Sequence, residues 1–325
     1  MAIRIAYIGA GNFTNQCVFP QLFRHGLQLA AVCDLDEEKA SLAQNRYGFK
    51  EVYTDFRKML EVESPQAVFC VGGPKVHYPV GIEVLERGFP LYVQKPPAPS
   101  SAATKEMAEL AVKKGVVCHV GFNLRSSVAA QQAKAIVGAE DFGNPRMGMF
   151  RYGLCSGRTM DDVVMDQHCH LIDLARFLLG DVKAVKVIQS RLPEARDYVV
   201  AMEFESGVVG TLNFTSGQIP EKEFIYFEIT GANTFLYSHG CSSLKWYRPT
   251  DGAWWQSQQP DYVWERGMYG GQVMLEALGY VAGVNINISD GSFAENNKPA
   301  SNGFCVYGGF PARDAAMSRF CSQLS

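Results

Sequence analysis

The sequence predicts a two-domain α/β protein, in which a doubly wound parallel sheet is followed by an α+β domain with a large, mostly antiparallel sheet. Two observations predict this fold class. Short apolar runs alternate with helical patterns up to about residue 120, and strand signals then follow one another with few helices between them. The 325 residues, of which 47% are hydrophobic, are enough for two cores. We therefore expect one domain at residues 1–122 and a second at 123–325.

The first domain is built from repeated strand and helix signals. The apolar runs expected to form strands are residues 3–8, 29–33, 67–71, 91–93 and 116–120. Amphipathic patterns predict helices at residues 37–47, 55–62, 76–87 and 101–114. Gly88 and Gly115 follow the last two helices, where a left-handed residue commonly ends a helix. Such alternation predicts a parallel sheet with helices on both faces.

The second domain begins with helices and continues with strands. A helix is expected at residues 127–137, a strand at 145–152 and a strongly periodic helix at 164–179, which Gly180 ends. Further strands are expected at residues 182–191, 198–205, 208–216, 223–231, 234–238 and 243–247. A turn signal at residues 205–207 favours antiparallel pairing. Residues 290–303 read as a surface loop before a short final helix at about 312–323.

Composition and charge exclude several classes of function. The net charge is −3 and basic residues are dispersed among acidic ones, so nucleic acid is not expected as a partner. The sequence begins without a signal-peptide pattern and has no apolar stretch of about 18 residues, so we expect a cytoplasmic protein with no membrane contact. Nine scattered cysteines without a C-x-x-C pair predict neither a disulfide framework nor a zinc site.

A glycine-rich loop at residues 9–14 follows the first strand and has the pattern G-x-G-x-x-T. Gly9 permits a tight turn, and Gly11 lets the backbone approach a pyrophosphate at a helix N-terminus. Asp34 ends the second expected strand, twenty residues beyond Thr14, where its carboxylate would accept hydrogen bonds from ribose hydroxyls. An incidental glycine turn is the competing interpretation. The context instead predicts a Rossmann dinucleotide site that prefers NAD, with NADP possible.

A lysine follows the fourth expected strand of the first domain. Lys95 precedes two prolines and lies at the carboxyl edge of the predicted sheet, where open α/β sheets bind ligands. Its ammonium can donate to a substrate oxygen and stabilise developing alkoxide charge. A solvated surface lysine is the ordinary alternative, but it does not explain the rigid Pro96–Pro97 pair.

A histidine and two carboxylates share one face of the helix expected at residues 164–179. Asp166, His170 and Asp173 have the spacing i, i+4 and i+7, while His168 points elsewhere. A carboxylate one turn away can orient the imidazole, which predicts His170 as a general acid or base. A structural buried His–Asp pair and a metal ion held by His170 with the aspartates are the alternatives, and we expect no metal.

These residues together resemble the Gfo/Idh/MocA oxidoreductases, which are named for glucose–fructose oxidoreductase and inositol dehydrogenase. The resemblance covers roughly residues 3–250. Its motifs occur in order as the Gly9 loop, Asp34, residues 72–77, residues 94–96, Asn123 with Arg125, and residues 166–173. It implies an NAD(P)-dependent enzyme that transfers hydride between nicotinamide and a hydroxyl or ketone of a sugar, sugar derivative or cyclitol.

The resemblance also implies roles for individual residues. Catalysis is assigned to Lys95, Asp166 and His170, and substrate binding to these three with Arg125. The residues expected to bind the cofactor are Gly9, Gly11, Asn12, Phe13, Asp34, Gly72, His77, Gln94, Lys95 and Asn123. The second sheet of this family shapes the substrate pocket and often mediates assembly, so a homodimer or homotetramer is expected.

The chain departs from the family pattern at several positions. Gln94 stands where the family usually has Glu, which removes a negative charge beside Lys95. Thr14 replaces a small residue of the phosphate loop, and Gly72 and Gly73 stand where Thr-Pro is frequent. His168 often corresponds to Gly, so its side chain is expected to crowd or contact the substrate. Residues 285–297 are too polar and Gly-rich for the family's last helix.

Two other classes of function are open at this point. Some related enzymes are glycosidases that use bound NAD for transient oxidation, and tightly retained NAD without net NADH production would mark them. A non-catalytic protein that senses a sugar or dinucleotide is the other class. Such a sensor has little reason to keep Lys95 together with Asp166 and His170.

Overall fold

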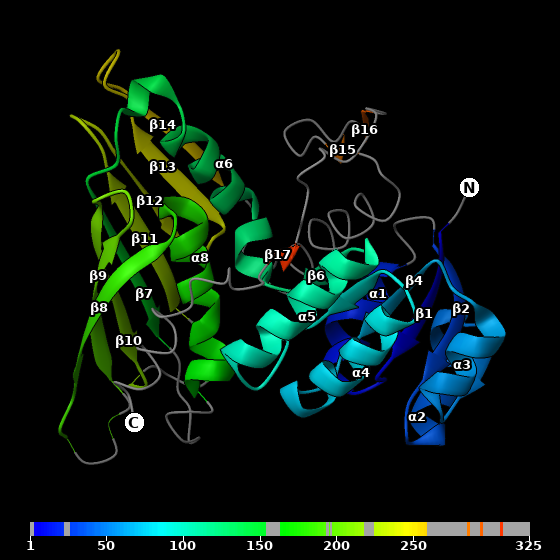
Figure 1. The fold of residues 1–325 in the computed structure, drawn as a ribbon. Coiled ribbons are helices and arrows are strands. Elements are labelled where there is room, and N and C mark those ends of the chain that lie inside the picture. The colour runs from blue at the N-terminus through cyan, green and yellow to red at the C-terminus, as the bar shows by residue number, and fades with distance from the viewer. Residues whose placement is uncertain are drawn as a thin grey trace. The chain divides into compact units, whose positions relative to one another are not determined.

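A computed structural model describes residues 3–22, 27–153, 163–192, 195, 197–217 and 224–258, together with three two-residue strands. The chain divides into two compact units, which meet in sequence between Phe122 and Asn123 (Figure 1). The first unit is Met1–Phe122 with Glu265–Ala312, and the second is Asn123–Trp264 with Arg313–Ser325. The final helix expected at residues 312–323 lies outside the described residues.

The sheet of the first unit is parallel throughout and has the order β17-β6-β5-β4-β1-β2-β3. Its strands are β1 (Arg4–Ile8), β2 (Gln28–Cys33), β3 (Glu51–Tyr53), β4 (Ala67–Cys70), β5 (Leu91–Val93), β6 (Cys118–Val120) and β17 (Val306–Tyr307). The predicted doubly wound sheet is confirmed. The pairing of β17 with β6 differs from the expectation that every residue after 122 belongs to the second domain.

The helices of the first unit lie around this sheet (Figure 1). They are η1 (Thr14–Val18), α1 (Phe19–Leu22), α2 (Glu37–Tyr47), α3 (Phe56–Glu63), α4 (Pro74–Glu86) and α5 (Ser101–Lys114). Local signals set their ends. The Asp36 side chain accepts from two backbone N–H groups at the start of α2, and Gly115 ends α5 in the left-handed conformation, as expected. Helix α4 begins two residues before the predicted start because Pro74 suits a first turn.

Four aromatic rings form a ladder across the first sheet. Tyr7, Phe69, Tyr92 and His119 occupy registered positions on β1, β4, β5 and β6, and all four are buried. Their ring centroids are 5.9, 5.0 and 5.7 Å apart in order, in stacked arrangements. Aromatic contacts contribute roughly 0.5–1.5 kcal/mol per pair beyond area burial. The ladder therefore fixes the positions of β1, β4, β5 and β6 relative to one another. The segments that follow these strands contain residues of the predicted site.

The second unit contains an eight-stranded sheet of order β14-β13-β12-β11-β7-β10-β9-β8. Its strands are β7 (Met147–Gly153), β8 (Val182–Gln189), β9 (Tyr198–Phe204), β10 (Val209–Thr215), β11 (Phe224–Thr230), β12 (Phe235–His239), β13 (Ser243–Tyr247) and β14 (Trp254–Gln258). All pairs are antiparallel except β7 with β10. The predicted mostly antiparallel sheet is thus confirmed. The strands β15 (Asn285–Ile286) and β16 (Phe293–Ala294) form a separate pair.

Helices of the second unit pack on one face of its sheet. They are η3 (Asn123–Ser126), α6 (Val128–Val137), η4 (Glu140–Phe142), η5 (Val164–His168) and α8 (Cys169–Leu179). Helix α8 contacts β7, and α6 contacts β13. Side chains along β7, β9 and β10 alternate between buried and more exposed positions, as expected for a sheet covered on one face.

The helix expected at residues 164–179 is not uniform. Its first five residues, η5, form a π-helical turn, and α-helical geometry begins only at Cys169. Such turns are rare and occur often at functional sites. This one carries Asp166 and leads directly into the turn that carries His170.

Within the described residues, no helix combines the length and the apolar character needed to cross a lipid bilayer.

Candidate functional site

The glycine-rich loop is fixed by close backbone contacts. Gly9 has φ +99°, and a Cβ added to it would lie 1.9 Å from the Val71 carbonyl oxygen, so only glycine fits. Its N–H donates to the Cys33 carbonyl at 2.8 Å. Around Gly11, by contrast, no heavy atom of the described residues lies within 4 Å of an added Cβ. The loop is therefore held firmly at Gly9 and open at Gly11, as close approach of a ligand to the backbone requires.

Asp34 ties this loop to the end of β2. One carboxylate oxygen, Oδ2, accepts from the Ala10 N–H at 2.7 Å, and Oδ1 accepts from the Asp36 N–H at 3.0 Å. The side chain is partly exposed, and each oxygen has further lone pairs. The carboxylate can thus brace the loop and still accept hydrogen bonds from a ribose.

Asn15 is a loop-holding residue that the sequence interpretation missed. Its Nδ2 donates to the carbonyls of Ala10 and Gly11 at 2.7 and 3.0 Å, and its own carbonyl accepts from the Tyr47 hydroxyl at 2.8 Å. Asn12 and Phe13 are exposed beside it. An amide side chain four residues after Gly11 is the only sequence signal that points to this role. The loop carbonyls are therefore partly satisfied from within the first helix.

His77 connects the segments that follow β4 and β5. Its Nε2 accepts from the Gly72 N–H at 2.8 Å, and its Nδ1 lies 2.8 Å from the Pro96 carbonyl oxygen. The side chain has no exposed surface. Burial lowers the pKa of His77 to about 4, and the charge of Lys95 also lowers it, against the hydrogen bond to Pro96. Because both ring nitrogens are hydrogen-bonded to backbone groups, His77 is better suited to hold the loop in shape than to contact a cofactor directly.

Gln94 lies between this bridge and the sheet. Its N–H donates to the Cys70 carbonyl at 3.1 Å, and its Oε1 accepts from the Lys95 N–H at 2.6 Å. The side chain is only 4% exposed, and its Nε2 has no hydrogen-bond partner among the described residues. Because an unmade buried hydrogen bond is costly, this amide suits a bound group that offers an acceptor. Lys95 itself is half-buried.

In the second unit, Arg125 is held by Asp173. Its Nε donates to Asp173 Oδ2 at 2.8 Å, its Nη2 donates to Oδ1, and its guanidinium lies 5.4 Å from the ring centroid of Phe177. The Arg125 side chain is 14% exposed and that of Asp173 is 7% exposed. The Arg125 guanidinium thus forms a bidentate pair with Asp173, and its expected use for substrate binding stays a prediction. Asp173, likewise, is committed to Arg125.

Asn123 begins the same turn as Arg125. Its side chain is fully buried, and neither its Nδ2 nor its Oδ1 has a hydrogen-bond partner among the described residues. The turn is anchored nearby, since Gln131 Nε2 donates to the Arg125 carbonyl at 2.7 Å. A buried amide with both atoms unsatisfied is suited to a ligand that both donates and accepts.

His168 and His170 have different surroundings. His168 is buried against Phe214, with ring centroids 4.2 Å apart, and its Nδ1 lies 2.6 Å from the Tyr198 hydroxyl. Burial lowers the pKa of His168 to about 3. The expectation that it crowds or contacts the substrate is therefore corrected, because this histidine packs into the sheet. His170 is buried in the first turn of α8, and Asp166 is half-buried in η5.

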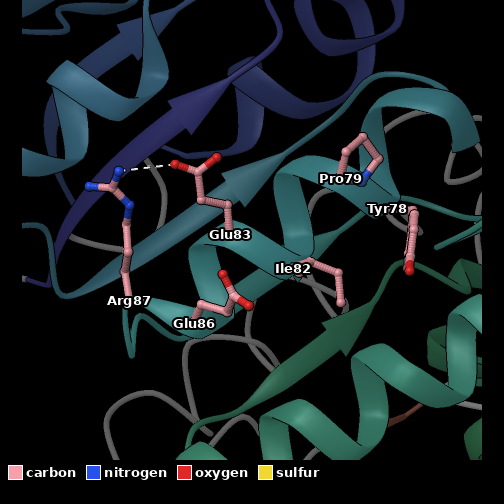
Figure 2. Close-up of a pocket in the computed structure, with 6 residues that line it drawn as sticks. All are labelled: Tyr78, Pro79, Ile82, Glu83, Glu86 and Arg87. Carbon is pink, nitrogen blue, oxygen red and sulfur yellow. Dashed lines mark hydrogen bonds and ion pairs between the residues drawn. The ribbon is translucent and has the colours of Figure 1, made fainter.

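A hollow of about 530 Å³ lies on the outer face of α4 (Figure 2). Its lining residues are Tyr78, Pro79, Ile82, Glu83, Glu86 and Arg87. Glu83 and Arg87 form an ion pair across one turn at 3.0 Å. No residue expected to bind cofactor or substrate lines this hollow. Among the described residues, no three His, Cys, Asp or Glu side chains gather as metal ligands.

The fold and the loop define a doubly wound dinucleotide-binding protein. A sequence model described as "Oxidoreductase family, NAD-binding Rossmann fold" matches residues 3–122, and a model of the GFO/IDH/MocA C-terminal domain matches residues 130–236. Together they cover more than two thirds of the chain. The chain therefore belongs to the Gfo/Idh/MocA family of oxidoreductases, and its first domain is the NAD-binding Rossmann domain of that family.

Individual relatives agree with this assignment. A D-glucoside 3-dehydrogenase of Escherichia coli K12 is 28% identical over 201 residues, which are 58% of this chain and 57% of that protein. Inositol 2-dehydrogenase 4 of Saccharopolyspora erythraea is 28% identical over 223 residues, which are 65% of this chain and 66% of that protein. The chain thus matches less than two thirds of the length of either relative.

The fold also resembles that of a solved levoglucosan dehydrogenase in complex with NADH and L-sorbose. The two structures share a TM-score of 0.75 at 18% sequence identity, over 86% of this chain and 89% of that chain. At this level of sequence identity, the match shows that the two proteins share a fold.

Proposed function

We propose that this protein is an NAD-dependent dehydrogenase that acts on a hydroxyl or ketone of a sugar, a sugar derivative or a cyclitol. One observation carries the proposal. The ends of β1, β2, β4 and β5 and the residues that follow them are hydrogen-bonded in series at the carboxyl edge of one sheet. The bonds run from Gly9 N to Cys33 O, Ala10 N to Asp34 Oδ2, Val71 N to Ile8 O and Gln94 N to Cys70 O. Ligands of open α/β sheets bind at this edge.

The residues of the first unit fit the cofactor. The open backbone at Gly11 suits the pyrophosphate, Asp34 suits the ribose hydroxyls, and the unsatisfied Gln94 amide suits an acceptor group. Asn12, Phe13 and Gly72 extend this set, as does the Asn123 amide of the second unit. When bound, NAD supplies the acceptor for the hydride that leaves the substrate carbon. The carboxylate of Asp34 favours NAD, because it would repel the phosphate of NADP.

Lys95, His170 and Asp166 supply the acid–base chemistry in this proposal. The Lys95 ammonium donates a hydrogen bond to the substrate oxygen and stabilises alkoxide character on it. An imidazole nitrogen of His170 takes the hydroxyl proton during oxidation and returns it during reduction. Asp166 orients His170, a role that Asp173 is less suited to share because its carboxylate is bound by Arg125.

We also propose that the protein is a homodimer or homotetramer that buries the open face of the second sheet. Several large apolar side chains are more than a third exposed on that face, namely Met147, Met149, Val199 and Val209. Strand pairing places Val209 beside Met147, so the apolar surface is continuous across β7 and β10. Contiguous apolar surface of this kind commonly marks an interface. Light scattering after size-exclusion chromatography would test the assembly, and a monomer would contradict it.

The experiment that tests the function is absorbance at 340 nm with NAD or NADP against a panel of sugars, inositols, sugar acids and glycosides. The proposal expects a rise with NAD and one class of polyol. Cleavage of a glycoside by protein carrying bound NAD, without net NADH, would replace it with a redox-cycling glycosidase. No reaction in either assay would favour a sensor.

A further inference from the structure

We propose that His77 is a positioning residue whose imidazole sets the Lys95–Pro96 segment against the Gly72 amide, so that one side chain couples cofactor binding to placement of the lysine. The inference rests on the dehydrogenase function proposed above, since it concerns how that site is assembled. His77 acts here through backbone groups and touches neither substrate nor cofactor.

The two hydrogen bonds fix which ring nitrogen carries the proton. The Gly72 N–H can only donate and the Pro96 carbonyl can only accept, so Nε2 is the acceptor and Nδ1–H is the donor. The His77 ring and Pro96 are buried, whereas Gly72 is exposed. Breaking the bond to Pro96 removes a partner from the carbonyl of a buried residue, and breaking the bond to Gly72 removes the acceptor of a backbone N–H at an exposed residue.

The bridge lies just beyond the end of the sheet. Strands β4 and β5 are paired up to Cys70 and Val93, and the Gln94 N–H adds one more bond to the Cys70 carbonyl. Beyond this point the segments that follow β4 and β5 are no longer paired as strands. His77, in the first turn of α4, is hydrogen-bonded to Gly72 in one segment and to Pro96 in the other. Lys95 is therefore fixed on both sides, by the Gln94 side chain at its own N–H and by His77 at Pro96.

The electrostatic state of the ring suits this role. A protonated imidazole would donate from both nitrogens and could not accept from Gly72. Burial lowers the pKa of His77 to about 4, with a further lowering by the Lys95 charge, so the ring stays neutral at physiological pH.

Two substitutions separate the two bonds. His77→Gln places an acceptor near the position of Nε2 and removes the donor to Pro96. His77→Asn places a donor near the position of Nδ1 and removes the acceptor for Gly72. One lost buried hydrogen bond corresponds to roughly a tenfold change. We expect H77Q to lower kcat about tenfold with the Kd for NAD nearly unchanged, and H77N to weaken NAD binding about tenfold with a smaller change in kcat.

Hydrogen exchange of the Gly72 amide gives a readout that does not depend on turnover. We expect the amide to be protected in the wild-type protein and in H77Q, and to exchange faster in H77N. Tyr78→Phe is the matched control. Tyr78 is the next residue in α4, but its hydroxyl donates a hydrogen bond to Glu106 of α5 and not to the Gly72 or Pro96 segments. This variant should leave Kd, kcat and the Gly72 exchange rate unchanged.

The proposal is overturned if H77Q and H77N change kcat and Kd in the same ratio, or lower only the stability. A wild-type protein that binds NAD but turns over no substrate would contradict the proposed function instead. In that case the Kd values and the Gly72 exchange rates still decide whether His77 forms the bridge.

Discussion

The two units hold their predicted catalytic side chains by different kinds of contact. In the first unit, Lys95 is flanked by neutral groups, the Gln94 amide and the His77 bridge. In the second, the helix that carries His170 is joined to the turn of Asn123 by a charged pair, Arg125 with Asp173. The printed contacts of the first unit are thus neutral hydrogen bonds, whereas that of the second is an ion pair whose two charges offset each other.

Loss of these contacts should have unequal costs. A buried charge without its partner is far more costly than a buried neutral group without one. The comparison therefore predicts that the second unit is the more fragile to single substitutions at its support residues. The first unit should instead show its defects in catalysis and cofactor binding.

The largest expected effect is on the stability of the second unit. Arg125→Met leaves the buried Asp173 carboxylate unpaired and should lower the free energy of unfolding by about 3–5 kcal/mol, measured by urea denaturation. The double variant Arg125→Met with Asp173→Leu should recover much of that loss. Lys183→Met, which breaks the exposed pair with Glu203, should cost less than about 1 kcal/mol. If Arg125→Met and Lys183→Met lower the free energy of unfolding equally, the predicted difference between the units is wrong.

The next effect is on turnover. Lys95→Met removes the donor to the substrate oxygen and should lower kcat at least about a hundredfold, with the Kd for NAD nearly unchanged. Lys105→Met, on the exposed side of α5, is the control and should behave as wild type. Steady-state kinetics with the best substrate of the panel would measure both. Wild-type turnover in Lys95→Met would remove this lysine from the mechanism.

A smaller effect is expected on cofactor affinity. Asp34→Ala removes a ribose acceptor and the tie to Ala10, so NAD binding should weaken roughly ten- to a hundredfold, since hydrogen bonds to charged groups are worth about 1.5–3 kcal/mol. Calorimetric titration would measure it, and the Kd of the sugar should change far less. Asp36→Asn keeps the cap of α2 and is the control. Unchanged NAD affinity would make Asp34 a structural residue only.

The last effect is on stability in acid, and it is the smallest near neutral pH. His168 has its pKa lowered to about 3 in the folded state, against about 6.5 when unfolded. Between these values only the unfolded chain binds the proton, so stability falls as pH falls from about 6.5, by about 1.4 kcal/mol per pH unit. His168→Gln should be less stable at pH 7 but lose less on acidification, as urea titrations at pH 7, 5 and 4 would show. Parallel losses in both proteins would mean that His168 is charged when folded.

Local signals in the sequence were enough for most of the fold. The helix predicted at residues 37–47 has those bounds in the structure, because Asp36 and Gly48 cap it from within the same segment. The strand predicted at residues 3–8 begins one residue later, at Arg4. The π turn of η5 was not predictable in this way, because hydrophobic period does not distinguish it from an α-helical turn.

The site was predictable in its residue types but not in its contacts. The motifs placed Lys95 and Asp34 at strand ends, where the structure has them. The Arg125–Asp173 pair spans 48 positions and the His77–Pro96 bond spans 19, so neither follows from local spacing. The pairing of β17 with β6 is of the same kind, since a two-residue strand has almost no pattern of its own.

The central claim is that hydride passes directly between a substrate carbinol carbon and the cofactor. The most direct test uses the best substrate of the panel with deuterium at that carbon, and mass spectrometry of the reduced cofactor. The account predicts NADH that carries one deuterium at C4 of the nicotinamide. Unlabelled NADH, or substrate consumed without any net reduction of NAD, would contradict it.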